Sequence, residues 1–83
     1  MTTPDWLTKR EGNLREGPNS STYMVVLNGH PQYRLVAVPA TGKFSCVVTQ
    51  SNNGKRLDEG VNYPSLNEAL QGGLEELRKK LGW

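Results

Sequence analysis

Histidine and cysteine, the side chains most often used for acid–base and nucleophilic catalysis, each occur once in this chain, as His30 and Cys46. Catalysis by an imidazole usually needs an orienting carboxylate and a nearby nucleophile, and the spacing around His30 indicates neither. Cys46 alternates with Phe44 and Val48 in a β-rich stretch, which predicts a buried core residue rather than an accessible thiolate. We therefore expect no catalytic residue, and the sequence does not predict an enzyme.

Metal and phosphate sites are equally poorly supported by the residue pattern. One histidine and one cysteine cannot give the ligand spacing of a zinc site, and an oxygen-only site needs clustered acids. The adjacent acidic pairs, Asp58-Glu59 and Glu75-Glu76, are expected on an edge strand and on an exposed helix turn, in contact with solvent. Thr41-Gly42-Lys43 and Asn53-Gly54-Lys55 fall between two predicted strands, whereas phosphate-binding loops join a strand to a helix. We expect no metal, no cofactor and no small-molecule substrate.

Binding through a charged surface is one chemistry that the sequence does allow. The candidate residues for binding nucleic acid are Arg34, Lys43, Lys55 and Arg56, which belong to one predicted strand and to two turns. On a sheet laid in a DNA groove, such side chains contact phosphates and base edges. In a meander, however, the turn before Lys43 and the turn before Lys55 lie at opposite ends of the sheet, so these charges do not all converge.

Length and composition indicate one small domain. Its 83 residues carry a net charge of only +2, from 10 basic and 8 acidic residues that are scattered along the chain, without the concentrated basic excess of a dedicated nucleic-acid binder. A single cysteine excludes an internal disulfide and suits a reducing cytoplasm. The first twelve residues lack the pattern of a signal peptide, and no run of 18 apolar residues is present, so we expect a cytoplasmic protein without a membrane partner.

The stretch from Ser65 to Gly82 predicts a helix whose start, buried face and end can all be read. Ser65 and Glu68 have the spacing of a capping box, leucines recur every three or four residues, and Gly82 can adopt the left-handed conformation that ends a helix. Gly72 and Gly73 each cost about 0.8–1 kcal/mol in an exposed helix interior. We expect that Gly73 lets the helix lie close to a sheet; a kink or a partner's backbone approaching the glycines are the alternatives.

The residues before this helix predict a β-meander. We expect strands at 23–27, 32–38, 43–50 and, shorter and more polar, at 56–61. Short connections make successive strands pair, so the predicted fold is α+β: an antiparallel meander of three to four strands with a C-terminal helix packed on one face (ββββα). Residues 22–83 are expected to form this single domain, after an N-terminal segment, residues 1–21, that is a short helix or a tail.

Both faces of the predicted sheet are apolar in the middle, yet one helix covers only one face. Trp6, Leu7 and Leu14 could fold back over the second face, or a second subunit, a partner protein or a nucleic acid could cover it. We therefore predict a small non-enzymatic interaction module that binds a protein partner or forms a homodimer through this face. The residues expected to contribute are Met24, Val26, Arg34, Val36, Val47 and the terminal anchor Trp83.

The alternative is nucleic-acid binding through the sheet and the basic turns. Three strands followed by a helix, from Tyr33 through Leu81, with the hairpin sequences GKF at 42–44 and NGKR at 53–56, resemble the arm-type DNA-binding domains of tyrosine integrases and the plant Apetala-type domain. That resemblance implies a sheet that enters the DNA major groove. The segment 65–70, which follows a strand pair, also resembles HicB-type antitoxin domains.

Overall fold

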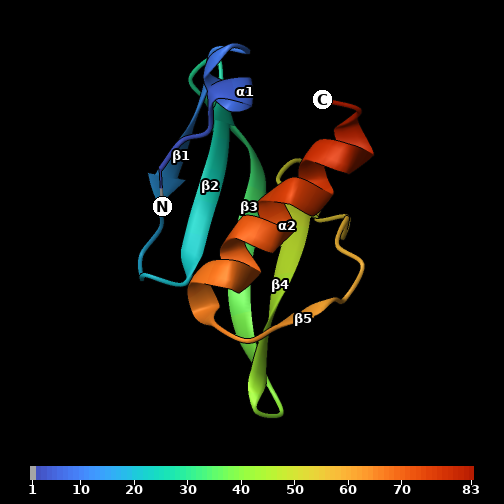
Figure 1. The fold of residues 1–83 in the computed structure, drawn as a ribbon. Coiled ribbons are helices and arrows are strands. Elements are labelled where there is room, and N and C mark those ends of the chain that lie inside the picture. Colours follow the sequence, from blue (N-terminus) through green and yellow to red (C-terminus); the bar gives the residue numbers. More distant parts are fainter. Residues whose placement is uncertain (1) are drawn as a thin grey trace.

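The sheet is a five-stranded antiparallel meander, with the strands side by side in chain order (Figure 1). The computed structural model describes residues 2–83. The α+β class, the meander and the helix that packs on it are confirmed. The elements, in order, are α1 (Asp5–Thr8), β1 (Gly12–Glu16), β2 (Thr22–Leu27), β3 (His30–Ala40), β4 (Lys43–Gln50), β5 (Asn62–Tyr63) and α2 (Leu66–Leu81).

Both edges of the sheet differ from the prediction. The segment Gly12–Glu16 is a strand that pairs with β2, although its sequence GNLRE holds one apolar residue and no β-branched one. Leu14 supplies the reason, because it packs on the core and its backbone N–H donates to the Thr3 hydroxyl at 3.1 Å. The domain boundary expected after residue 21 therefore cuts through the sheet.

The fourth strand, expected at residues 56–61, is absent from that segment. Within this segment, Arg56 forms one isolated β-bridge with Thr49. The strand that pairs with this edge of β4 is β5, later in the chain. The Asp58 carboxylate accepts the Val48 N–H at 3.0 Å, where a neighbouring strand would present a backbone carbonyl. Gly60 then turns the chain with a φ of 74°. The edge of β4 is thus closed partly by a side chain.

The hairpin between β2 and β3 is tighter than the prediction, which left the four residues 28–31 as a turn between two strands. Asn28 and Gly29 both have positive φ, 52° and 79°, as a two-residue type I′ turn requires. β3 therefore begins at His30. Opposite the step from Val25 to Val26, the register shifts by one residue, which leaves Gln32 without a partner in β2 and makes a bulge in β3.

Helix α2 has the predicted ends and the predicted close approach to the sheet. The Ser65 hydroxyl accepts from the Glu68 N–H at 3.2 Å, and Gly82 is left-handed. A Cβ on Gly73 would collide with the Cys46 side chain of β4, and one on Gly72 would collide with the ring of Tyr63. Both glycines are therefore required by packing, and α2 continues through them without a break.

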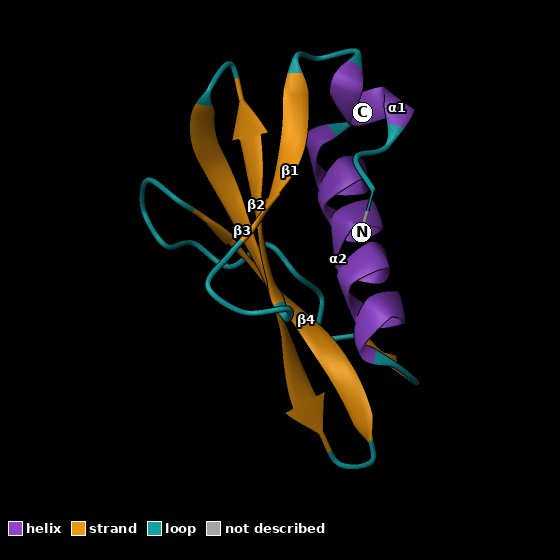
Figure 2. Cartoon of the chain, turned by 90° about the vertical axis from the view of Figure 1, so that its left-hand side faces the viewer, coloured by secondary structure: helices purple, strands orange, loops and turns teal. Residues whose placement is uncertain are grey.

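Both helices lie on the same side of the sheet (Figure 2). Leu7 of α1 is fully buried and belongs to the same core as the leucines of α2, with Trp6 and Leu14 packed against it. The expectation that these three residues cover the second face is therefore wrong. The core is formed by residues from α1, three strands and α2: Leu7, Tyr23, Val25, Leu35, Ala37, Cys46, Val48, Ala69, Leu70, Leu74 and Leu77.

Substituting Gly73 tests the contact between α2 and β4. Alanine gains about 1 kcal/mol of helix propensity, but overpacking against Cys46 costs about 1–3 kcal/mol, so we expect Gly73→Ala to lower the free energy of unfolding. Urea denaturation measures the change. Gln71→Ala, on the exposed side of the helix, is the matched control and should have little effect. A Gly73→Ala protein as stable as the wild type would contradict the close approach.

Candidate interaction face

The sheet face turned away from α1 and α2 is covered by neither helix, and we call it the open face (Figure 2). Its members follow from the pairing register, because side chains alternate between the two faces along each strand. Four aliphatic residues of the open face, on three adjacent strands, are partly exposed: Met24, Val36, Val38 and Val47. Val36 and Val47 are direct cross-strand partners. These neighbours shield one another, so none of them is fully exposed.

An arginine row crosses this face at right angles to the strands. Met24 of β2 pairs with Arg15 of β1 on one side and with Arg34 of β3 on the other. Arg34 in turn pairs with Thr49 of β4, which bridges to Arg56. We define Arg15, Arg34 and Arg56 as the arginine row. All three are exposed, and they alternate with Met24 and Thr49.

The guanidinium at one end of the row is held in place. Arg56 donates to both carboxylate oxygens of Asp58, at 3.1 and 2.8 Å, and the side chain of Asp58 is only 1% exposed. Asp58 was expected to be solvated on an edge strand, and this expectation is wrong because the carboxylate also accepts the Val48 N–H. The hydrogen bond from Arg56 holds the pKa of Asp58 below its usual range, and the same bond raises the pKa of Arg56.

The rest of the row is free of carboxylates. Within residues 2–83, neither Arg15 nor Arg34 forms an ion pair or a hydrogen bond to an acidic side chain. The open-face positions of β1 to β4 carry arginines, Lys43, hydroxyl and amide groups, and no acid. The acids lie elsewhere, as in Glu68, Glu75 and Glu76 of α2. The open face is therefore more positive than the net charge of +2 indicates.

The residues predicted for protein binding are only partly brought together. Met24, Arg34, Val36 and Val47 share the open face, as the alternation predicted. Val26 is on the same side by register but is only 2% exposed, so it offers no contact surface.

Trp83 lies away from the open face, on the helix side. It packs with its ring centroid 6.1 Å from that of Trp6, under the guanidinium of Arg10 at 4.4 Å. Arg78 completes this cluster, since it lies 5.6 Å from the Trp6 ring and donates to the Trp83 carbonyl. The cluster joins α1 to the end of α2. Trp83 therefore packs at this junction and is not part of the open face.

The residues predicted for nucleic-acid binding divide in the same way. Arg34 and Arg56 are in the row, but Lys43 lies six positions along β4 from Thr49, near the opposite hairpin. The Gln50 N–H donates to the backbone carbonyl of Lys55, one position beyond Thr49, so Lys55 is not part of the arginine row. The prediction missed Arg15, because β1 was not recognised as a strand. Its one signal was Leu14, a single apolar residue between polar ones.

Cys46 is buried in β4, as the sequence predicted, whereas His30, which was expected in the turn before residue 32, is the first residue of β3. Cys46 is 2% exposed, and burial raises the pKa of its thiol to about 12, with the charges of Glu76 and Asp58 as smaller causes. A thiol with this pKa is not a nucleophile at neutral pH. His30 is exposed at the start of β3. Among residues 2–83 there is no cluster of three potential metal ligands.

A polar site between β5 and α2 was not expected. The Oε1 atom of Glu76 is buried and has no hydrogen-bond partner in the described part of the chain. Burial raises the pKa of Glu76, and the charges of Glu59 and Asp58 add to this shift. Burial likewise raises the pKa of the Tyr63 hydroxyl, with a further contribution from the charge of Glu76. The expectation that Glu75-Glu76 is a solvated pair is therefore wrong for Glu76.

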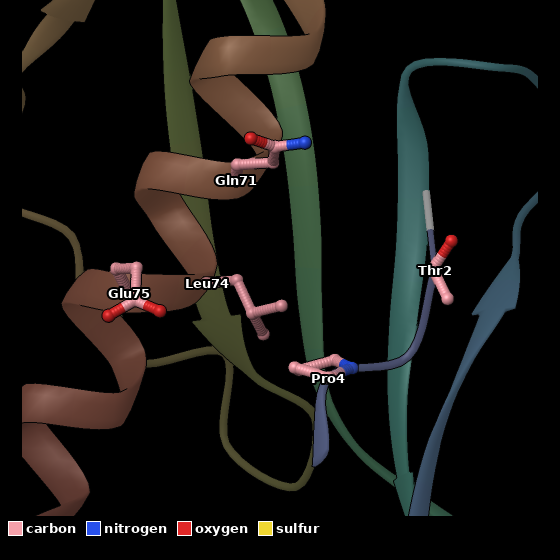
Figure 3. Close-up of a pocket in the computed structure, with 5 residues that line it drawn as sticks. All are labelled: Thr2, Pro4, Gln71, Leu74 and Glu75. Carbon is pink, nitrogen blue, oxygen red and sulfur yellow. The ribbon is translucent and has the colours of Figure 1, made fainter. Parts of the chain in front are cut away.

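A surface groove lies between the N-terminal segment and α2 (Figure 3). Its volume is about 300 Å³, and Thr2 and Pro4 face Gln71, Leu74 and Glu75 across it. Its lining offers one hydroxyl, one amide and one carboxylate, with no histidine, cysteine or lysine beside them. The groove is therefore a weaker candidate site than the open face.

No protein-family model, curated protein or solved structure matches this chain. Within residues 2–83, no helix combines the length and the apolar character needed to span a membrane.

Acid titration tests the contrast between Glu76 and Asp58. The folded-state pKa of Glu76 lies above its ordinary value of 4.5, so we expect stability to rise as pH falls toward 4.5 and Glu76 becomes protonated. The folded-state pKa of Asp58 lies below its ordinary value of 3.8, so below pH 3.8 we expect stability to fall. Urea denaturation from pH 7 to pH 3 should show both changes. Glu76→Gln should remove the rise and Asp58→Asn the loss. A rise that persists in Glu76→Gln would contradict the assignment.

Proposed function

We propose that this domain is a non-enzymatic interaction module that binds its partner through the open face. One observation carries the proposal: both helices pack on the same side of a five-stranded sheet, which leaves the other side without a covering helix. Isolated sheets need cover on both faces when both carry apolar side chains. Met24, Val36, Val38 and Val47 supply an aliphatic patch in the middle of that face.

The charges on this face favour a different molecule over a second copy of the chain. Two copies that stacked through their open faces would bring two sets of arginines together. Like charges in a desolvated interface oppose association. Arg15 and Arg34, which have no carboxylate partner within residues 2–83, instead complement an acidic partner. The homodimer is therefore the less favoured form of the proposal.

Site-specific photo-crosslinking tests the location of the partner. A photo-reactive residue replaces Val36, on the open face, or Gln71, on the exposed side of α2, and each protein is irradiated in an extract of the source cell. We expect a discrete adduct from position 36 and none from position 71. Nuclease and protease digestion then classify the adduct, and sedimentation of the purified chain at several concentrations tests self-association. Adducts only from position 71, or from neither position, would contradict the proposal.

A further inference from the structure

We propose that the partner is nucleic acid and that the arginine row holds the phosphate backbone of a duplex across the open face. This inference rests on the proposed function and adds the class of partner. Adjacent strands are about 4.8 Å apart, so Arg15, Arg34 and Arg56 are spaced about 10 Å from one to the next, over about 19 Å in total. The row is thus a line of cations rather than a point charge, and a linear polyanion matches it.

The chemistry of the row suits phosphates. Arginine presents a planar fork of donors that matches phosphate oxygens in a bidentate way. The Arg56 guanidinium donates to Asp58 through Nε and Nη2. These bonds hold the group in one orientation and leave its other N–H donors available. Thr49, between Arg34 and Arg56, adds a hydroxyl of the kind that commonly contacts phosphate or sugar.

The uncharged part of the open face indicates which form of nucleic acid binds. Its strand positions hold aliphatic and small polar side chains and no aromatic ring, because Tyr23, Tyr33 and Phe44 all pack on the core side. Bases of a single strand are usually held by stacking on aromatic side chains. A face without such rings binds through phosphates, which a duplex displays on its outside, so duplex should bind at least as well as single strand.

Other acidic partners fit the face less well. A membrane surface is usually bound by lysine and by aromatic side chains at the interface, which this face does not combine. An acidic protein would offer irregular charges, whereas the arginines repeat at every second strand. An acidic protein remains as an outcome of the experiment, in which poly-glutamate represents it.

The test is fluorescence anisotropy with the full chain, using a labelled DNA duplex, its single strand, an RNA duplex and poly-glutamate as probes. Arg56 is already paired with Asp58, so two phosphates are counted, one for Arg15 and one for Arg34. Affinity for the DNA duplex should then fall about 12-fold between 50 and 200 mM salt, from a slope of about −0.9 per phosphate. Arg15→Gln and Arg34→Gln should each weaken binding about tenfold and reduce that slope by about 0.9.

A matched control removes one positive charge outside the open face. Lys79→Gln, on the exposed side of α2, should change the affinity less than twofold. Thermal unfolding confirms that every variant is folded. Equal losses in the row variants and in Lys79→Gln, preference for the single strand, or equal binding of poly-glutamate would overturn the inference.

The two proposals fail in different ways. If no nucleic acid binds while position 36 still crosslinks to a protein, the class of partner is wrong and the interaction module stands. If nucleic acid binds but Arg15→Gln and Arg34→Gln leave the affinity unchanged, and position 36 gives no adduct, binding occurs elsewhere and the open face has no role in it.

Discussion

The contact between Gly73 and Cys46 sets the distance between α2 and the sheet, and much of the structure depends on it. Because Gly73 has no side chain, the helix lies directly over β4 and its leucines reach residues of three strands. A single helix of 16 residues can then complete most of the core. Leu7 of α1 is fully buried in the same core. Both helices therefore cover the same face of the sheet.

The open face, which neither helix covers, also differs in charge from the helix side of the sheet. Alternation along the strands places arginine and lysine on the open face, whereas the helix side carries acids such as Glu68 and Glu75. The small net charge of the chain conceals this separation. A nearly neutral composition is thus compatible with a face that attracts acidic partners, because binding depends on where charges lie rather than on their sum.

The segment between β4 and β5 shows how a side chain can complete a sheet edge. Asp58 accepts the Val48 N–H and is ion-paired to Arg56, so one buried carboxylate replaces a strand carbonyl and fixes the end of the arginine row. On the other side of the same segment, Glu76 is partly buried, and its Oε1 atom has no hydrogen-bond partner among residues 2–83. The two carboxylates have pKa values shifted in opposite directions, because Asp58 gains a hydrogen bond from Arg56, whereas Glu76 loses water on burial and has negatively charged neighbours.

The sequence by itself determined the elements that local signals specify. The helix from its cap at Ser65 to Gly82, the hairpin at Asn28-Gly29 and the burial of Cys46 all follow from patterns within a few residues. Only the tertiary structure decided the rest. β1 is a strand because Leu14 packs on the core and the backbone of β1 pairs with the edge of β2. α1 lies on the same side of the sheet as α2 because Leu7 is buried in the core there. The arginine row joins Arg15 and Arg56, which are 41 positions apart in the chain, through three successive pairings of neighbouring strands and the bridge from Thr49 to Arg56. Its first pairing requires β1, which the sequence did not indicate as a strand.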